Sequence, residues 1–171
     1  MRTDDGQAEP AAPRWLDAEE REVWVTVAAS LTLLDGALDA RLQREAGMSH
    51  FEYRVLARLS EATDRTAPTS QLAILTNGSL SRLSHTTSRL EKRGWVARRP
   101  DPSNGRVTLV ALTDEGWAKL VEAAPGHVEM VRRMVFDPLT KAQQRHLGEA
   151  HRRILKALTY RTAGHDARGE T

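Results

Sequence analysis

The sequence of 171 residues contains no cysteine. This absence excludes a disulfide framework, a cysteine-ligated zinc site, an iron–sulfur cluster and a thiol redox sensor. Long apolar runs are also missing, because no segment approaches about 18 consecutive apolar residues. The N-terminus is acidic, unlike a secretory signal, which has a basic segment followed by an apolar run. These features predict a cytoplasmic protein with no membrane association, long enough to fold without a structural metal.

The sequence motifs of several enzyme classes are missing as well. There is no P-loop, no dinucleotide-binding G-x-G-x-x-G and no serine-hydrolase G-x-S-x-G. The six histidines form no H-E-x-x-H motif and no pair four residues apart; His146 and Glu149 are one weak pair at a spacing of three. Many acidic residues stand at helix starts, where capping explains them. We therefore expect no enzymatic activity, no cofactor and no metal site.

Charge is nearly balanced overall but unevenly distributed along the chain. The formal net charge is +2. Residues 1–47 carry five basic and ten acidic side chains, whereas residues 80–106 carry seven basic and two acidic ones. A local cationic segment of this kind attracts polyanions, although it also fits the solvated face of an ordinary helix.

The chain reads as one structural unit between two tails. Residues 1–13 contain too few large apolar groups to pack and are predicted to be a disordered arm, and residues 161–171 a disordered tail. A long helix is predicted to begin at Asp17 and to stop at Gly47. Its apolar stripe is longer than one small domain usually covers, so part of it is expected to meet a second chain. The stripe consists of Leu16, Val23, Trp24, Val27, Leu31, Leu34, Leu38 and Leu42.

Three further helices are predicted in the middle of the chain. Ser49 and Glu52 form an S-x-x-E capping box, which begins a helix that ends near Ser60. After a loop at residues 61–68, a two-turn helix at residues 70–77 is expected to bury Leu72, Ala73 and Leu75 and to break at Gly78. Ser79 can then cap a helix over residues 80–93 that turns Leu83, Thr87 and Leu90 inward.

The apolar period changes from 3.6 to 2 at Trp95. Residues 95–99 and 106–112 are predicted strands, joined by a hairpin loop that contains Asn104-Gly105. Thr113 caps a following helix, which is expected to break or kink at Pro125-Gly126, and Thr140 with Gln143 begins the last helix. The predicted fold is mainly α with a small β-hairpin.

A short helix, a tight turn, a second helix and a hairpin together make a winged helix-turn-helix. The outward face of the second helix carries Arg82, His85, Arg89 and Lys92, interspersed with Ser81, Ser84 and Ser88. Guanidinium groups and hydroxyls are suited to phosphates and base edges in a DNA groove. Glu91 is the only acidic residue between Ser79 and Arg99. Because a merely solvated face more often mixes both signs, this pattern favours binding to double-stranded DNA.

The hairpin contributes three further arginines. Arg98, Arg99 and Arg106 lie on a narrow projection that is able to reach a minor groove. For Arg98 and Arg99, an ordinary surface hairpin protected by charge is an equally good explanation.

Residues 15–158 resemble the MarR family of bacterial transcriptional regulators. The most specific parts are LAILTNGSLSRLSHTTSRLEKRGWVARR at residues 72–99 and DPSNGRVTLVALTDEG at residues 101–116. The resemblance implies a homodimer formed by helices in residues 15–47 and 114–160, with winged heads at residues 49–113 that bind a pseudo-palindromic operator. It also implies DNA contacts from Ser79, Ser81, Arg82, Ser84, His85, Arg89 and Arg106.

Two features depart from the family pattern. The family usually has an aspartate two residues before the wing arginine, where it orients the guanidinium, but here that position is Asn104. An amide accepts a hydrogen bond without supplying charge. Thr86 and Thr87 replace residues that are usually apolar, and their hydroxyls can bond to the preceding turn.

The resemblance further implies regulation by a small aromatic effector that binds between the dimerisation helices and the head. Trp24, His50, Phe51 and Arg54 are the candidate effector residues. For each of them a simpler explanation is preferred: core packing for Trp24 and Phe51, and surface exposure for His50 and Arg54. The predicted function is a ligand-responsive repressor. The alternatives are a winged-helix module that binds an acidic protein surface and a small helical enzyme with an unrecognised site.

Overall fold

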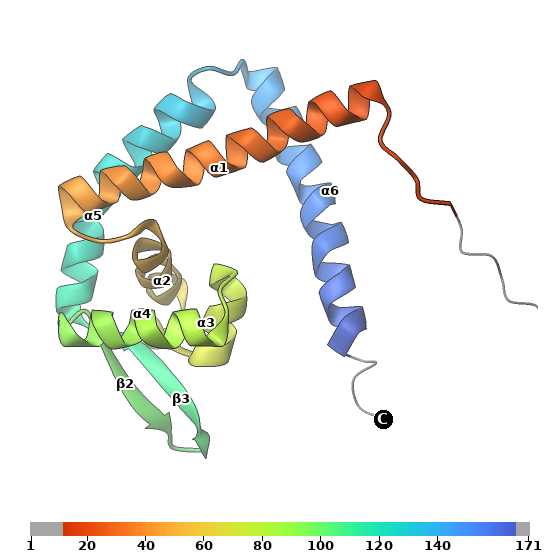
Figure 1. Cartoon of the computed structure of the whole chain (residues 1–171). Helices are drawn as coiled ribbons and strands as arrows, with labels where there is room; N and C mark the ends of the chain where they lie inside the picture. Colours follow the sequence, from red (N-terminus) through yellow and green to blue (C-terminus); the bar gives the residue numbers. More distant parts are fainter. Residues whose placement is uncertain (1–11, 167–171) are drawn as a thin grey trace, which may run out of the picture. The chain divides into compact units, whose positions relative to one another are not determined.

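The computed structural model describes residues 12–166, and the side chains of residues 12–159 (Figure 1). Most of the predicted N-terminal arm and residues 167–171 therefore lie outside the described residues. The elements in chain order are α1 (Ala18–Ala46), α2 (His50–Glu61), η1 (Thr63–Arg65), β1 (Thr66–Pro68), α3 (Thr69–Thr76), α4 (Leu80–Lys92), β2 (Val96–Asp101), β3 (Asn104–Leu112), α5 (Asp114–Val131), η2 (Arg132–Phe136) and α6 (Lys141–Asp166). The chain forms two units that divide after Asp35, within α1.

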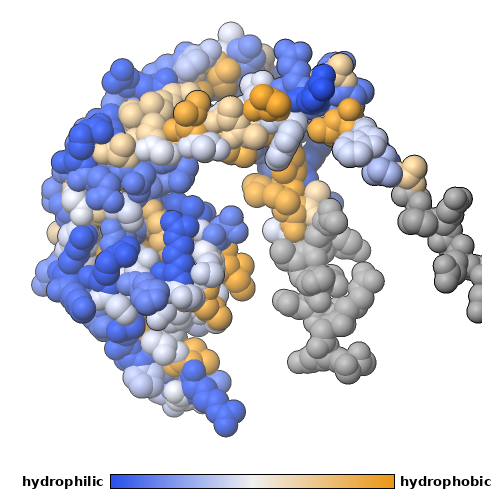
Figure 2. Space-filling view, viewed as in Figure 1, coloured by the Kyte–Doolittle hydropathy of each residue, from blue (hydrophilic) through white to orange (hydrophobic). Residues whose placement is uncertain are grey.

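The first unit ends with the N-terminal half of α1. Asp17 and Glu20 cap the start of the helix. The N–H of Asp17 donates to Glu20 Oε2 at 3.0 Å, and the N–H of Glu20 donates to Asp17 Oδ1 at 2.8 Å. The predicted single apolar stripe is incomplete, because Val25 and Leu33 lie off it and are 60% and 73% exposed. Figure 2 shows this exposed apolar surface along α1. By length and mean hydropathy alone, α1 could cross a membrane, although it contains no long uninterrupted apolar run.

The second unit contains the hydrophobic core. Leu38 and Leu42, at the end of the predicted stripe, are buried. The predicted capping box of α2 is confirmed, since Ser49 Oγ accepts the N–H of Glu52 and the Glu52 carboxylate accepts the N–H of Ser49. The core packs around α2 and is formed by Leu42, Ala46, Met48, Phe51, Tyr53, Val55, Leu56, Leu59, Ala67, Leu72, Ala73, Leu83, Leu90, Val96, Val110, Leu112, Leu120 and Ala123.

The predicted hairpin is part of a three-stranded antiparallel sheet in the order β1-β3-β2. β1 lies within the segment that the sequence predicts as a loop, and its Thr66 and Pro68 pair with Ala111 and Leu109. Three residues are too few to show an alternating pattern, so this strand depends on its partner rather than on its own sequence. Pro68 fits there because β1 is an edge strand, where a missing N–H is tolerated.

Two further expectations about the second unit, the burial of Leu75 and a break in α5, are wrong. Leu75 is 44% exposed, because α3 turns Leu72, Ala73 and Thr76 inward instead. α5 is not broken at Pro125 and continues to Val131, where the π-helical segment η2 follows. The proline deprives the carbonyl of Val121 of its donor, but Val121 is half exposed and water can reach that side of the helix.

The last helix starts where the sequence predicts and runs further. Thr140 and Gln143 form the expected box, in which the N–H of Thr140 donates to Gln143 Oε1 at 2.9 Å. α6 extends to Asp166 and so includes residues 161–166 of the predicted tail. Its apolar residues Leu147, Ile154, Leu155 and Leu158 remain 38–57% exposed.

Candidate nucleic-acid interface

The turn between α3 and α4 leaves no room for a side chain at position 78. Asn77 ends α3 in the left-handed conformation, with φ of 51°. A Cβ on Gly78 would lie 2.7 Å from Cζ of the buried Phe51 ring. Ser79 then caps α4, its Oγ accepting the N–H of Arg82 at 3.1 Å. The Ser79 hydroxyl thus fixes the start and direction of α4.

α4 separates a buried face from an exposed polar one, as predicted. Leu83, Thr86, Thr87 and Leu90 are buried. The Thr87 hydroxyl donates to the carbonyl of Ser84 at 3.1 Å, which is the back-bonding expected for a threonine at an apolar position. The exposed face carries Ser81, Arg82, Ser84, His85, Arg89 and Lys92.

Arg82 and Arg89 rest on the first turn of α2. The Arg82 guanidinium lies 4.0 Å above the centroid of the Phe51 ring, a cation–π arrangement. Arg89 donates from Nε to Glu52 Oε1 at 3.3 Å, and Arg93 approaches Glu52 Oε2 at 3.9 Å. The sequence predicts the capping role of Glu52 but not these contacts, because residues 37 positions apart are joined only by the fold.

The tip of the wing is stabilised by side chains of its own turn. Asp101 accepts hydrogen bonds from the N–H and the hydroxyl of Ser103, which lower the pKa of its carboxyl. Asn104 Oδ1 accepts the backbone N–H of Arg106 at 3.3 Å. Asn104 therefore contacts the backbone of the wing arginine, and Arg106 itself is exposed.

Arg98 connects the base of the wing to α4. Its Nη2 lies 2.7 Å from Glu91 Oε2, and its backbone N–H donates to Glu91 Oε1 at 3.0 Å. The Arg98 guanidinium beside Glu91 holds the pKa of that carboxyl below its usual value. Arg98 thus has a structural partner, whereas Arg99 is exposed on β2.

α4 and the wing enclose a shallow hollow of about 280 Å³. It brings together Ser84 of α4 and Arg98 and Arg106 of the two wing strands. Hydroxyls from the start of α3 and from β3 complete its wall, supplied by Thr69, Ser70 and Thr108. The hollow therefore combines two arginines of the wing with hydroxyls from α3, α4 and β3 on one concave surface.

Known proteins are similar to this chain in sequence and in fold. The model of the MarR family matches residues 48–108. The HTH-type transcriptional regulator PecS of Dickeya dadantii (strain 3937) is 32% identical over 149 residues, which cover 84% of this chain and 86% of PecS. This chain belongs to the MarR family.

Solved MarR-family structures have the same fold. Sco3205 of Streptomyces coelicolor, solved in complex with DNA, is 47% identical with a TM-score of 0.83, over 86% of this chain and 92% of that one. AbsC of the same organism is 33% identical with a TM-score of 0.80, over 86% and 99%. The HTH-type transcriptional repressor YetL of Bacillus subtilis (strain 168) is 28% identical over 85 residues, half of each chain. The chain is thus a DNA-binding transcriptional regulator and not an enzyme.

The four effector candidates of this MarR protein have different environments. Trp24 is 59% exposed on the part of α1 that belongs to the first unit. Phe51 is 6% exposed and supports Gly78 and Arg82, and Arg54 donates to the carbonyl of Thr76 at the end of α3. The backbone N–H of His50 donates to Asp39 Oδ1 at 2.7 Å. Phe51 and Arg54 thus have structural roles in the head.

An aromatic cluster joins α2 to α5. The ring of His127 lies 4.3 Å from that of Tyr53 and 5.6 Å from that of His50, measured between centroids. Burial is the main cause that lowers the pKa of His127, and the nearby His50 adds to it. Burial also raises the pKa of Tyr53. Within the described residues, His127 Nδ1 is buried without a hydrogen-bond partner, and no group of three metal-ligating side chains is present.

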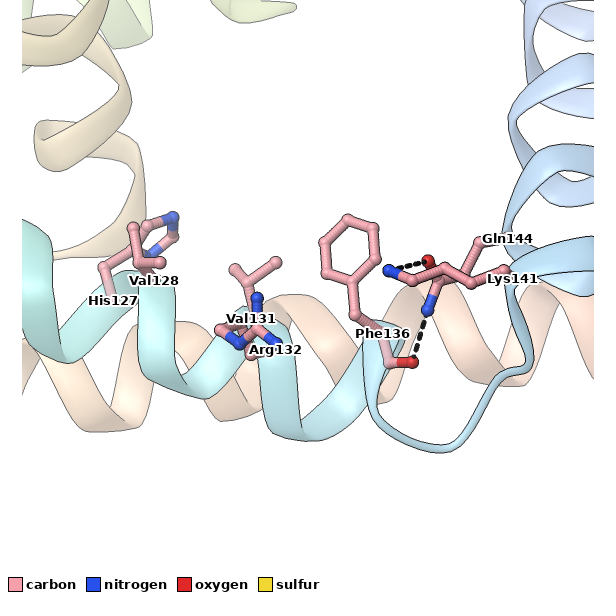
Figure 3. Close-up of a pocket in the computed structure, with 7 residues that line it drawn as sticks. All are labelled: His127, Val128, Val131, Arg132, Phe136, Lys141 and Gln144. Carbon is pink, nitrogen blue, oxygen red and sulfur yellow. Dashed lines mark hydrogen bonds between the residues drawn. The ribbon is translucent and has the colours of Figure 1, made fainter.

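Next to this cluster, α5, η2 and the start of α6 surround an open hollow of about 480 Å³ (Figure 3). Val128, Val131 and Phe136 give it an apolar wall, and Gln144 closes one end by donating to the carbonyl of Phe136 at 2.8 Å. His127 lines the hollow, but none of the four effector candidates does.

Proposed function

We propose that this MarR-family regulator binds its DNA through the exposed face of α4 and the wing. The contact residues are Ser79, Ser81, Arg82, Ser84, His85, Arg89 and Arg106. The exposed face of α4 carries this assignment, because Arg82, His85 and Arg89 lie on it among exposed serines. Ser84 of that face and Arg106 of the wing also line the same hollow. A helix of this width fits a major groove, and an arginine on a narrow hairpin suits a minor groove.

We further propose that the regulator is a cytoplasmic homodimer that represses transcription from a pseudo-palindromic operator. The apolar side chains left exposed on α1, α5 and α6 support a second chain as their cover. Helices in residues 15–47 and 114–160 would form this dimer, and residues 49–113 the head. The similarity to YetL, a transcriptional repressor, supports repression.

Release from DNA by a small aromatic effector completes the proposal. An effector that binds more tightly to a dimer whose heads are wrongly spaced shifts the population away from DNA, typically by about 1 to 3 kcal/mol of coupling. Trp24, His50, Phe51 and Arg54 remain the proposed effector residues, and the aromatic rings that join α2 to α5 support an effector site near that junction.

Operator binding is tested by gel retardation with duplexes from the intergenic region beside the gene. We expect Arg82→Ala and Arg89→Ala to weaken binding at least about tenfold, since each bidentate base contact contributes about 1 to 3 kcal/mol. Arg153→Ala is the matched control, because Arg153 is an 80% exposed arginine on α6, outside residues 49–113. Binding that is equal in all three variants would contradict the assignment of α4.

The wing is tested with operators that differ only in their flanks. Arg106→Ala is expected to weaken binding most where the flanks are A·T-rich, because their narrow minor groove concentrates negative potential. An equal loss on all flanks would instead indicate a phosphate contact by Arg106.

A further inference from the structure

We propose that Glu52 is a positioning residue for base reading, because it holds Arg89 so that the outer edge of its guanidinium faces a guanine. The inference rests on the proposed function, since it assumes that α4 enters the major groove. It concerns a residue of α2 that itself lies beneath the DNA-binding face.

The burial of Glu52 makes its partners important. Its side chain is only 4% exposed, and a carboxylate removed from water is costly unless it is paired. The N–H of Ser49 donates to Oε2 at 2.7 Å, Arg89 Nε donates to Oε1 at 3.3 Å, and Arg93 Nη1 lies 3.9 Å from Oε2. A helix cap needs only the first of these contacts. The carboxylate therefore connects the start of α2 to two arginines at the end of α4.

The two arginines differ in what remains to bind DNA. Arg93 Nη1 donates to the carbonyl of Gly47 at 3.0 Å, and its guanidinium lies 5.0 Å from the Trp95 ring. Arg93 is thus used within the protein. Arg89 contacts Glu52 through Nε, and its side chain is 58% exposed.

This use of Nε suits recognition of guanine. A guanidinium has five N–H donors in a fixed fork, and a bond at Nε leaves the four on the terminal nitrogens. A bidentate contact to O6 and N7 of guanine needs two parallel donors held in one orientation. A flexible arginine loses rotamer freedom when it forms that contact, whereas one already held by a buried carboxylate loses less.

The effect of Glu52→Gln on operator binding should be opposite to the effect expected from charge alone. Removing a negative charge beside DNA should strengthen binding to any duplex. If Glu52 positions Arg89, however, Glu52→Gln lowers the ratio of operator to random-duplex affinity by about tenfold. Glu61→Gln is the matched control, since it makes the same change at an exposed position of the same helix. It is expected to leave the ratio unchanged.

The decisive experiment starts from a duplex that the wild-type protein selects from a random-sequence library. Affinities are measured for each single G·C→A·T change in one half-site with wild type, Glu52→Gln, Arg89→Ala and the double variant. We expect Glu52→Gln and Arg89→Ala to lose discrimination at the same base pair. The double variant should lose no more than Arg89→Ala alone. Losses that multiply, or that are spread over all positions, would overturn the positioning role.

A second measurement covers the case in which Glu52→Gln does not fold. In the free wild-type protein, the Arg89 Nε–H resonance, assigned by its disappearance in Arg89→Lys, should exchange slowly with water. Rapid exchange would overturn the proposal. If the wild-type protein selects no sequence at all, operator binding itself fails and the inference fails with it. If only the positioning role of Glu52 is wrong, the wild-type protein still selects a sequence and Arg89→Ala still weakens binding to it.

Discussion

Gly78 links the proposed DNA-binding face to the hydrophobic core. An added Cβ meets the Phe51 ring at 2.7 and 2.9 Å, and that ring supports Arg82. We expect Gly78→Ala to lower the free energy of unfolding by about 1 to 3 kcal/mol, because the overpacking outweighs the smaller entropy gain in the unfolded chain. Urea denaturation at constant pH measures this change.

Gly105 provides the matched control for that substitution. A Cβ at Gly105 meets nothing within 4 Å, so Gly105→Ala should leave the urea midpoint unchanged or slightly raised. If the two variants were equally stable, the Phe51 ring would have to move aside freely. Phe51 would then not be a rigid support for Arg82.

His127 predicts how stability depends on pH. Burial, and to a lesser extent the nearby His50, lowers the pKa of His127 in the folded state. The unfolded chain therefore binds the proton more readily. The groups around it are Tyr53 and His50 on α2, with the Arg41–Glu45 ion pair of α1 near the adjacent Gly126. Stability should therefore fall as the pH drops through the ordinary histidine value of 6.5 toward the lower folded value.

The test compares thermal unfolding at pH 8 and pH 5 in two variants. His127→Gln should lose part of the difference in melting temperature between the two pH values. His146→Gln changes an exposed histidine on α6 and should retain the difference shown by wild type. A full difference in His127→Gln would show that other groups cause the pH dependence.

At this scale, local contacts could be predicted and long-range ones could not. The caps at Ser49, Ser79 and Thr113 follow from a hydroxyl residue placed just before a predicted helix, and all three are confirmed. The contacts of Arg82 with Phe51 and of Arg89 with Glu52 join segments more than thirty residues apart. No spacing rule relates such pairs, so the support beneath the predicted DNA-binding arginines emerged only from the fold.

Among the elements, α4 depends on its N-terminal cap, Ser79, for both its stability and its direction. Ser79→Ala removes the acceptor of the Arg82 N–H and is expected to cost about 0.5 to 2 kcal/mol of unfolding free energy. Ser81→Ala, two residues on and exposed, should cost much less. Circular dichroism during thermal unfolding compares the two. Equal losses would mean that the cap does not limit the stability of the head.

Three features of the elements differ from the sequence predictions because they depend on surroundings outside the element itself. β1 has only three residues and is a strand because β3 pairs with it. α5 passes through Pro125 because the carbonyl left without a donor is near solvent rather than in the core. Apolar side chains lie on several sides of α1, so its periodicity alone did not distinguish the part that the head covers, Leu38 and Leu42, from the part left exposed.

At the scale of the whole molecule, the exposed apolar residues require a cover. About half or more of the surface is exposed at several apolar residues of α1 and α6. They include Val23, Trp24, Leu31 and Leu33 on α1, and Ile154, Leu155 and Leu158 on α6. Apolar surface of this kind is normally covered by a partner or a membrane. Length and hydropathy allow either for α1. The homodimer proposed above makes a second copy of the chain the expected cover.

Aspartate substitutions in α1 decide between these covers. Leu31→Asp and Leu34→Asp each introduce a charge that cannot be buried cheaply, so we expect monomers or aggregates in place of the dimer. Leu31→Met is the control, because it keeps the position apolar and nearly conserves its volume. Light scattering after size exclusion measures the mass, and flotation with anionic vesicles measures membrane binding. A wild-type protein that floats with vesicles, or a Leu31→Asp variant that remains a well-behaved dimer, would remove α1 from the proposed dimer interface.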